Sequence, residues 1–202
     1  MRPHVVAHLA VSIDGATTGF EADQARFYAM ATLWQEDVTL VGADTILAQE
    51  SAVRTADRPG PRAAGPLLAV VDSRHRVHNL EDLRDLGYWS DVIGLYSDQT
   101  PARAPDSTTG ELVAGYEQVD LAEALELLHR RGAQVVRVDS GGTLVGVLLS
   151  LGLIDELSLL VHPVVVGAGP RWHGAFDGRF DLRLANTEVF EGGIVWLRYC
   201  TA

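Results

Sequence analysis

Polar and glycine-containing segments follow four apolar stretches that have the length and composition of buried strands. They lie at residues 12–15, 42–45, 72–76 and 140–143. In open α/β sheets, ligands bind beyond the carboxyl ends of the strands. The sequence therefore predicts one ligand site, built from turns that meet at the same edge of a sheet.

The fourth segment has the form of a phosphate-binding turn. A β-branched stretch at 135–138 leads through Ser140-Gly141-Gly142-Thr143 into an apolar stretch predicted to be a helix over 143–151. Glycines allow a close backbone approach, and the first N–H groups of a helix attract anions. The same pair of glycines also serves tight turns that bind nothing, so both interpretations stay open. Gly42 to Thr45 opens a second, shorter helix in the same way.

The third segment places a hydroxyl group and two guanidinium groups directly after a buried strand. Ser73, Arg74 and Arg76 are suited to hold the 2′-phosphate of an adenosine cofactor, because arginine binds phosphate through paired N–H groups. The alternative is a solvated arginine pair.

Asp14 in the first segment is either a catalytic carboxylate or the former of the turn that ends in Gly15. The seven histidines show no metal-binding spacing, and His162 before Pro163 is interpreted as a strand residue rather than a general base. No metal is predicted.

Strands that alternate with helices, followed by a hairpin, predict an α/β fold. We expect strands at 5–11, 38–41, 67–71, 92–96, 135–138, 157–166, 187–190 and 194–199, with exposed loops at 51–66 and 100–110. Predicted helices start at Asp23, Ile46, Leu80, Asp120 and Thr143. The pattern indicates a mainly parallel mixed sheet with helices on both faces and a C-terminal antiparallel hairpin.

Composition excludes several classes of function. The chain has 202 residues, 47% of them hydrophobic, which suits a single domain. A net charge of −11 argues against nucleic acid as a partner. The absence of lysine excludes Schiff-base and P-loop chemistry, and one cysteine, Cys200, cannot form an intrachain disulfide. With no signal-peptide or membrane-spanning pattern, we expect a soluble cytoplasmic protein.

Several motifs occur together in one order, and their combination is more specific than any one of them. They are Ser12-Ile13-Asp14-Gly15, Val41-Gly42-Ala43-Asp44-Thr45-Ile46-Leu47, Val71-Asp72-Ser73-Arg74, and the run from Ser140-Gly141-Gly142-Thr143-Leu144 through Leu153-Ile154-Asp155-Glu156-Leu157 to Pro163-Val164-Val165-Val166-Gly167. Over nearly the whole chain they resemble the reductase domain of riboflavin biosynthesis. That domain is the C-terminal half of a bifunctional deaminase-reductase and has the three-layer α/β/α fold of dihydrofolate reductase.

This resemblance implies a homodimeric oxidoreductase that uses NADPH to reduce 5-amino-6-(5-phosphoribosylamino)uracil, opening its sugar to a ribityl chain. By matching position, Ala10, Thr45 and Ser73 are expected to bind NADPH, together with Gly141, Gly142, Thr143, Leu144, Val145, Gly146 and Val147. Gly42 is expected to bind it as well, from its place in the turn after a strand. Asp14, Gln49 and Asp139 are the expected catalytic residues. Residues 1–202 are expected to be a single reductase domain without the zinc-binding deaminase half.

The departures from the family pattern lie on the substrate side. Gln49 stands where the family has an aspartate, Leu33 where it has an arginine for the substrate phosphate, and Asp139 where a glutamate contacts the pyrimidine. An aspartate can accept hydrogen bonds from the same donors as that glutamate. Two alternatives therefore remain: a reductase of the same fold acting on a pterin or folate, and a non-catalytic NADPH-binding protein.

Overall fold

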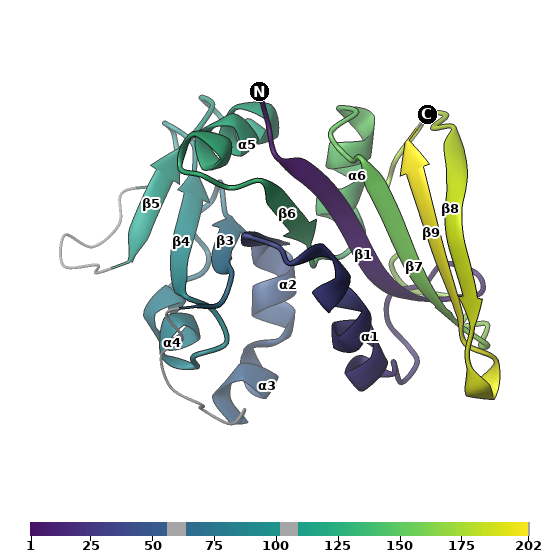
Figure 1. The fold of residues 1–202 in the computed structure, drawn as a ribbon. Coiled ribbons are helices and arrows are strands. Elements are labelled where there is room, and N and C mark those ends of the chain that lie inside the picture. The colour runs from purple at the N-terminus through teal and green to yellow at the C-terminus, as the bar shows by residue number, and fades with distance from the viewer. Residues whose placement is uncertain (56–63, 102–108, 202) are drawn as a thin grey trace. The chain divides into compact units, whose positions relative to one another are not determined.

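The computed structural model describes residues 1–55, 64–101 and 109–201. They group into two compact units, each made of two pieces of the chain (Figure 1). The first unit comprises Met1–Pro3 and Glu36–Val136, and the second His4–Gln35 and Arg137–Ala202. No helix in the described part of the chain is long and apolar enough to cross a membrane.

The first unit is built on parallel strands in the order β5-β4-β3-β2. Their bounds are β2 Val38–Gly42, β3 Leu67–Val71, β4 Asp91–Tyr96 and β5 Gly110–Val113. Gly42 pairs with Val71, and Val71 pairs with Leu95, so these strands end in line with one another. The turns that follow them therefore lie along the same edge. The helices of this unit are α2 Ala43–Ala48, α3 Glu50–Thr55, α4 Leu80–Asp85 and α5 Leu121–Arg130.

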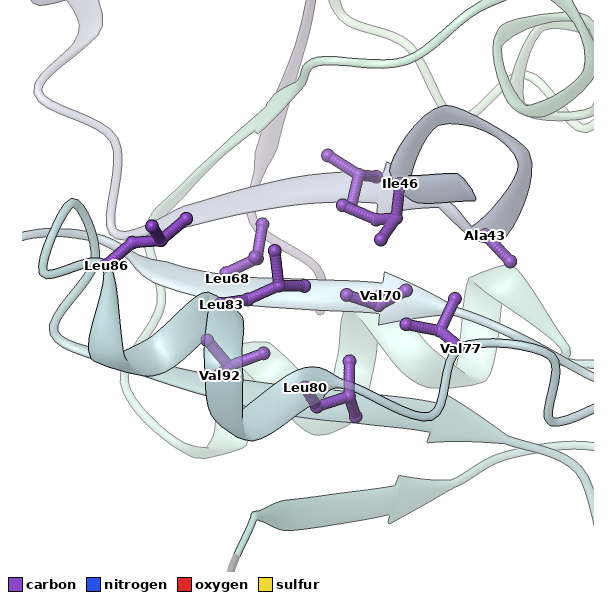
Figure 2. Close-up of a cluster of buried hydrophobic side chains, with 10 residues drawn as sticks. Ala43, Ile46, Leu68, Val70, Val77, Leu80, Leu83, Leu86 and Val92 are labelled. Atoms are coloured by element: carbon purple, nitrogen blue, oxygen red, sulfur yellow. The ribbon is translucent and has the colours of Figure 1, made fainter. Parts of the chain in front are cut away.

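One face of these strands is closed by α2 and α4, and Figure 2 shows the side chains that meet there. Leu68 and Val70 alternate along β3 with Ala69, so they share the face on which Leu83 of α4 packs. The helix α5 begins where predicted, because the Asp120 carboxylate accepts hydrogen bonds from the N–H groups of Ala122 and Glu123 at 2.9 and 3.1 Å.

The second unit combines a parallel pair of strands with an antiparallel hairpin, in the order β1-β7-β9-β8. Its strands are β1 His4–Ser12, β7 Glu156–His162, β8 Leu182–Val189 and β9 Val195–Thr201. Its helices are α1 Gln24–Ala31 and α6 Gly142–Ser150, with the short 3-10 turns η1 Thr32–Trp34 and η2 Glu191–Gly193. Strand β6, Val135–Val138, has residues in both units. The predicted α/β class with a C-terminal antiparallel hairpin is confirmed.

A buried hydrogen-bond chain joins α1 to the strands of the second unit. The Trp196 indole N–H lies 2.7 Å from Ser158 Oγ, which is 2.9 Å from Nδ1 of the fully buried His8. His8 Nε2 lies 2.9 Å from the carbonyl oxygen of Phe27, which can only accept. Nε2 therefore carries the proton and Ser158 donates to Nδ1. Ser158, His8 and Trp196 thus have hydrogen-bond partners inside an aromatic cluster, whereas the buried indole N–H of Trp34 in the same cluster has none among the described residues.

Several predicted boundaries were wrong. Helix α2 begins at Ala43 rather than at Ile46, because Gly42 directly precedes its first turn. The loop expected at 51–66 starts as helix α3, because no proline or glycine occurs before Pro59; residues 56–63 lie outside the described part. The loop expected at 100–110 ends at Gly110 with strand β5, whose four residues were not predicted, and residues 102–108 are likewise outside. Strand β7 stops at His162, because proline at 163 cannot donate to the ladder. The hairpin strands β8 and β9 are longer than expected.

Candidate functional site

In the first unit, the predicted phosphate-binding residues lie at the ends of two adjacent strands. Gly42 ends β2 and caps α2, whose first turn holds Thr45. Ser73, Arg74 and Arg76 follow β3, which pairs with β2 in parallel. The turn after Gly42 and the turn that begins at Asp72 therefore lie at the same edge of the sheet. Gln49, the predicted catalytic amide, is the exposed C-cap of α2.

Asp72 shapes the turn after β3. Its Oδ2 atom accepts hydrogen bonds from the backbone N–H groups of Arg76 at 2.6 Å and Val77 at 2.7 Å. Its Oδ1 atom is buried and has no hydrogen-bond partner within the described ranges. Ser73 Oγ accepts from the N–H of Val119 at 3.0 Å, so its hydroxyl proton can still be donated.

The two arginines of this turn have different surroundings. The Arg76 guanidinium donates to the Asp44 carboxylate at 2.7 Å and lies 3.9 Å from Asp72 Oδ1. Arg74 is exposed, and the described residues contain no hydrogen bond or ion pair to its side chain. Of the two, Arg74 is therefore the cation available to an incoming phosphate.

A small open cavity of about 190 Å³ lies where β4 and β5 end, and no sequence pattern indicated it. Tyr96, Ser97, Asp98, Thr100, Glu111 and Val113 line it together with Pro101. Two contacts connect its walls to the turn at residues 72–76. Thr100 Oγ1 donates to the carbonyl of Ser73 at 3.0 Å, and the His75 ring packs edge-on against Tyr96. Strand β5 supplies Glu111 and Val113 to the lining. Because this strand was not predicted from the sequence, the cavity could not be predicted either.

In the second unit, the Asp14 carboxylate is saturated with donors. It accepts from Ser12 Oγ at 2.6 Å, from the N–H groups of Val166 and Gly167 at 3.1 and 2.8 Å, and from the Arg171 guanidinium at 2.8 Å. The Ser12 hydroxyl and the Arg171 guanidinium lower the pKa of Asp14 well below its usual range. These contacts favour the turn-forming interpretation over a proton-donating one, since the group stays ionised.

The glycines at the start of α6 differ in their surroundings. A Cβ atom added at Gly142 would overlap the carbonyl oxygen of Arg171, and one at Gly146 would lie 2.5 Å from that of His173. These two glycines therefore admit the neighbouring 171–174 segment. A Cβ atom at Gly141 would meet nothing within 4 Å. Leu144 and Val145 are buried, whereas Thr143 and Val147 are exposed.

Asp139 follows β6 and is already paired. The Arg137 guanidinium, with only 4% of that residue exposed, donates to Asp139 Oδ2 at 3.0 Å. Partial desolvation, followed by the Asp139 charge, raises the pKa of Tyr28 on α1, although the residue as a whole is exposed. Tyr28 thus stands near the predicted pyrimidine-binding carboxylate, although no sequence pattern singled it out. Ala10, a predicted cofactor contact, lies in β1 opposite Leu160 and packs beside α1.

Comparison with known proteins identifies the class and then the family. The fold matches a solved pyrimidine reductase-like protein from Corynebacterium diphtheriae, with a TM-score of 0.72 over 99% of this chain and 92% of that one, at 20% identity. The protein is thus an α/β protein with the fold of these reductases. It belongs to the RibD C-terminal domain family, whose model matches residues 3–196.

Two archaeal relatives support the same placement. The chain is 29% identical to a protein of Archaeoglobus fulgidus, over 95% of this chain and 94% of the relative. It is 30% identical to a protein of Methanothermobacter thermautotrophicus, over 83% and 81% respectively. Both are named 2,5-diamino-6-ribosylamino-4(3H)-pyrimidinone 5′-phosphate reductase. The predicted family and oxidoreductase class are confirmed.

The Asp14 contacts predict a pH-dependent contribution to stability. Because its pKa is lower in the folded chain, the contribution is complete above the unfolded-state pKa of about 3.9 and is lost as pH falls through the folded value. Asp14→Asn should lower the melting temperature at pH 7, and the difference from wild type should shrink on acidification below about pH 4. Asp181→Asn, at an exposed carboxylate paired with Arg179, is the control and should change the melting temperature little. Equal effects of both variants at pH 7 would contradict the anchoring role.

The two N-terminal glycines of α6 should respond differently to alanine. Gly142→Ala should destabilise the fold by about 1–3 kcal/mol through overpacking against Arg171. Gly141→Ala should cost about 1 kcal/mol or less, because its φ of −71° suits any residue. If residues 141–143 hold a diphosphate, Gly141→Ala should nevertheless weaken NADPH binding several-fold. Urea unfolding and fluorescence titration measure the two effects, and unchanged NADPH affinity would remove Gly141 from the cofactor site.

Proposed function

We propose that this protein is an NADPH-dependent reductase of 2,5-diamino-6-ribosylamino-4(3H)-pyrimidinone 5′-phosphate. The observation that carries the proposal is the similarity to two archaeal reductases of that name, which extends over 94% and 81% of their lengths. This substrate differs from the uracil compound expected from the sequence by an amino group in place of the carbonyl at C2. A carboxylate such as Asp139 can accept a hydrogen bond from an amino group but not from a carbonyl.

A reductase of this family uses a nicotinamide cofactor, and the turn after β3 favours the phosphorylated form. Arg74 is an exposed cation without a partner among the described residues, and Ser73 can donate its hydroxyl proton. Asp72 Oδ1 is a buried acceptor that makes no hydrogen bond within the described residues, although the Arg76 guanidinium lies 3.9 Å away. Together these groups suit a phosphate and a ribose hydroxyl. When bound, NADPH supplies the hydride.

Reduction places a hydride on C1′ of the open-chain imine, and the imine nitrogen gains a proton to give the ribitylamine. The protein's task is to orient the reactants and to exclude water from the reacting carbon. None of the three predicted catalytic residues is suited to give the proton. Gln49 is an amide, Asp14 is held ionised, and Asp139 is paired with Arg137. We infer that solvent supplies it and that Asp139 serves binding.

We also propose a homodimer in the cytoplasm. The homodimer follows from the family resemblance, and an acidic chain with a single cysteine, Cys200, suits a reducing compartment. Both statements extend the enzymatic proposal and do not depend on the identity of the substrate.

A spectrophotometric assay tests the function. Loss of NADPH absorbance should occur with the diamino-pyrimidinone phosphate and more slowly with its uracil counterpart. Oxidation with dihydrofolate instead would favour the folate alternative suggested by Gln49 and Leu33. NADPH binding without turnover of any of the three would indicate the non-catalytic alternative.

The two arginines after β3 should differ in their effect on cofactor choice. Arg74→Ala should lower the preference for NADPH over NADH about tenfold, the size expected for one lost charge-assisted hydrogen bond. Arg76→Ala should change this ratio less, since its guanidinium is held by Asp44. Values of kcat/KM with both cofactors measure the ratio. A larger effect of Arg76→Ala would reverse the assignment.

A further inference from the structure

Strand β8 is the open edge of the second unit's strands. It pairs with β9 on one side only, and Figure 1 shows the two strands together at the yellow end of the chain. Arg183 to Val189 are all exposed. Its 8 residues exceed the usual strand length of about 5–6, and none is proline or lysine. A long edge of this kind offers unpaired backbone N–H and C=O groups to another strand.

The two faces of β8 have different chemistry. Leu184 is paired with Tyr199 of β9 and Asn186 with Arg198, so Ala185 is an extra residue that forms a bulge. The pairing with β9 therefore puts four side chains on one face, which are Leu182, Leu184, Thr187 and Val189. The opposite face carries Arg183, Asn186 and Glu188. One face of the strand is thus mainly apolar, and the other is charged.

Arg183 and Glu188 lie near opposite ends of the charged face. Both are exposed, and neither has a hydrogen bond or ion pair within the parts of the chain that the structure describes. They stand opposite Cys200 and Trp196 on β9, which cannot neutralise them. A strand with one cation and one anion at symmetric positions is complementary to an antiparallel copy of itself.

We propose that β8 pairs antiparallel with β8 of a second copy of this chain, with Ala185 opposite Asn186 of the second copy. This inference rests on the homodimer proposed above and assigns its surface. In this register, Arg183 lies opposite Glu188 of the second copy, and the two-fold symmetry produces the same ion pair twice. Directly opposite side chains on paired strands are close enough to interact.

The bulge makes this register possible. Opposite residues of an antiparallel pair must point to the same face, and without an extra residue positions 183 and 188 would point to opposite faces. Ala185 shifts the alternation by one, so 183 and 188 share a face, as do 184 and 187, and 182 and 189. Because both copies carry the same bulge, opposite residues share a face on both sides of it. On the apolar face, Leu182 then meets Val189, and Leu184 meets Thr187.

Charge reversal tests the pairing. Arg183→Glu and Glu188→Arg should each create two repulsive pairs and raise the dimer dissociation constant about tenfold or more. The double variant should regain the wild-type value. An equimolar mixture of the two single variants should also associate, since each heterodimer has two attractive pairs. Glu191→Arg, at an exposed residue just beyond β8, makes the same charge change and should leave association unchanged.

Light scattering after size-exclusion chromatography, over a series of protein concentrations, measures each constant. Dimers that both reversals leave intact would overturn the β8 surface while keeping the homodimer. A monomeric wild type at all concentrations would overturn both, and the bulge would then act as a device that protects the edge. The NADPH oxidation assay on the same samples reports separately on the proposed activity, so its failure is distinguishable from failure of the pairing.

Discussion

The close approach of α6 to the 171–174 segment constrains the architecture of the second unit. Gly142 and Gly146 leave room for the carbonyl groups of Arg171 and His173. The same segment is anchored from the other side, because the Arg171 guanidinium donates to both the Asp14 carboxylate and its backbone carbonyl. The turn after β1 is thus connected to the N-terminus of α6 through Arg171. Packing of this kind transmits small changes because protein interiors contain little free volume.

The chain has no lysine, so arginine side chains form most of the ion pairs with Asp and Glu in the described residues. Arg76, Arg137, Arg171 and Arg198 each hold a carboxylate at 3.0 Å or less. Two of these pairs, at Asp14 and Asp139, involve residues that the sequence marked as catalytic. A carboxylate that is paired in this way is fixed in place, and at Asp14 the contacts also hold the pKa below its usual range.

The sequence predicted the strands and capped helices well because their signals are local. The apolar stretch at Leu67–Val71 and the β-branched stretch at Val135–Val138 have the predicted bounds, and Asp120 caps α5 as its spacing indicated. Strand β5 was missed because four residues of mixed polarity carry no clear period. The partners of Gly142 were missed for another reason. They lie some thirty residues further along the chain, and a glycine pair has the same sequence signature whether it faces a phosphate or another backbone segment.

Residue patterns also left the substrate undetermined. The similarity to two named archaeal reductases reduced the number of candidate substrates. Leu33 and Gln49 depart from the family pattern, and both lie at exposed positions where a substitution costs the fold little. Asp139, in contrast, is oriented by the buried Arg137 and stands near Tyr28. A carboxylate positioned by a buried cation keeps a defined direction, which a residue must have if it is to distinguish an amino group from a carbonyl on a pyrimidine.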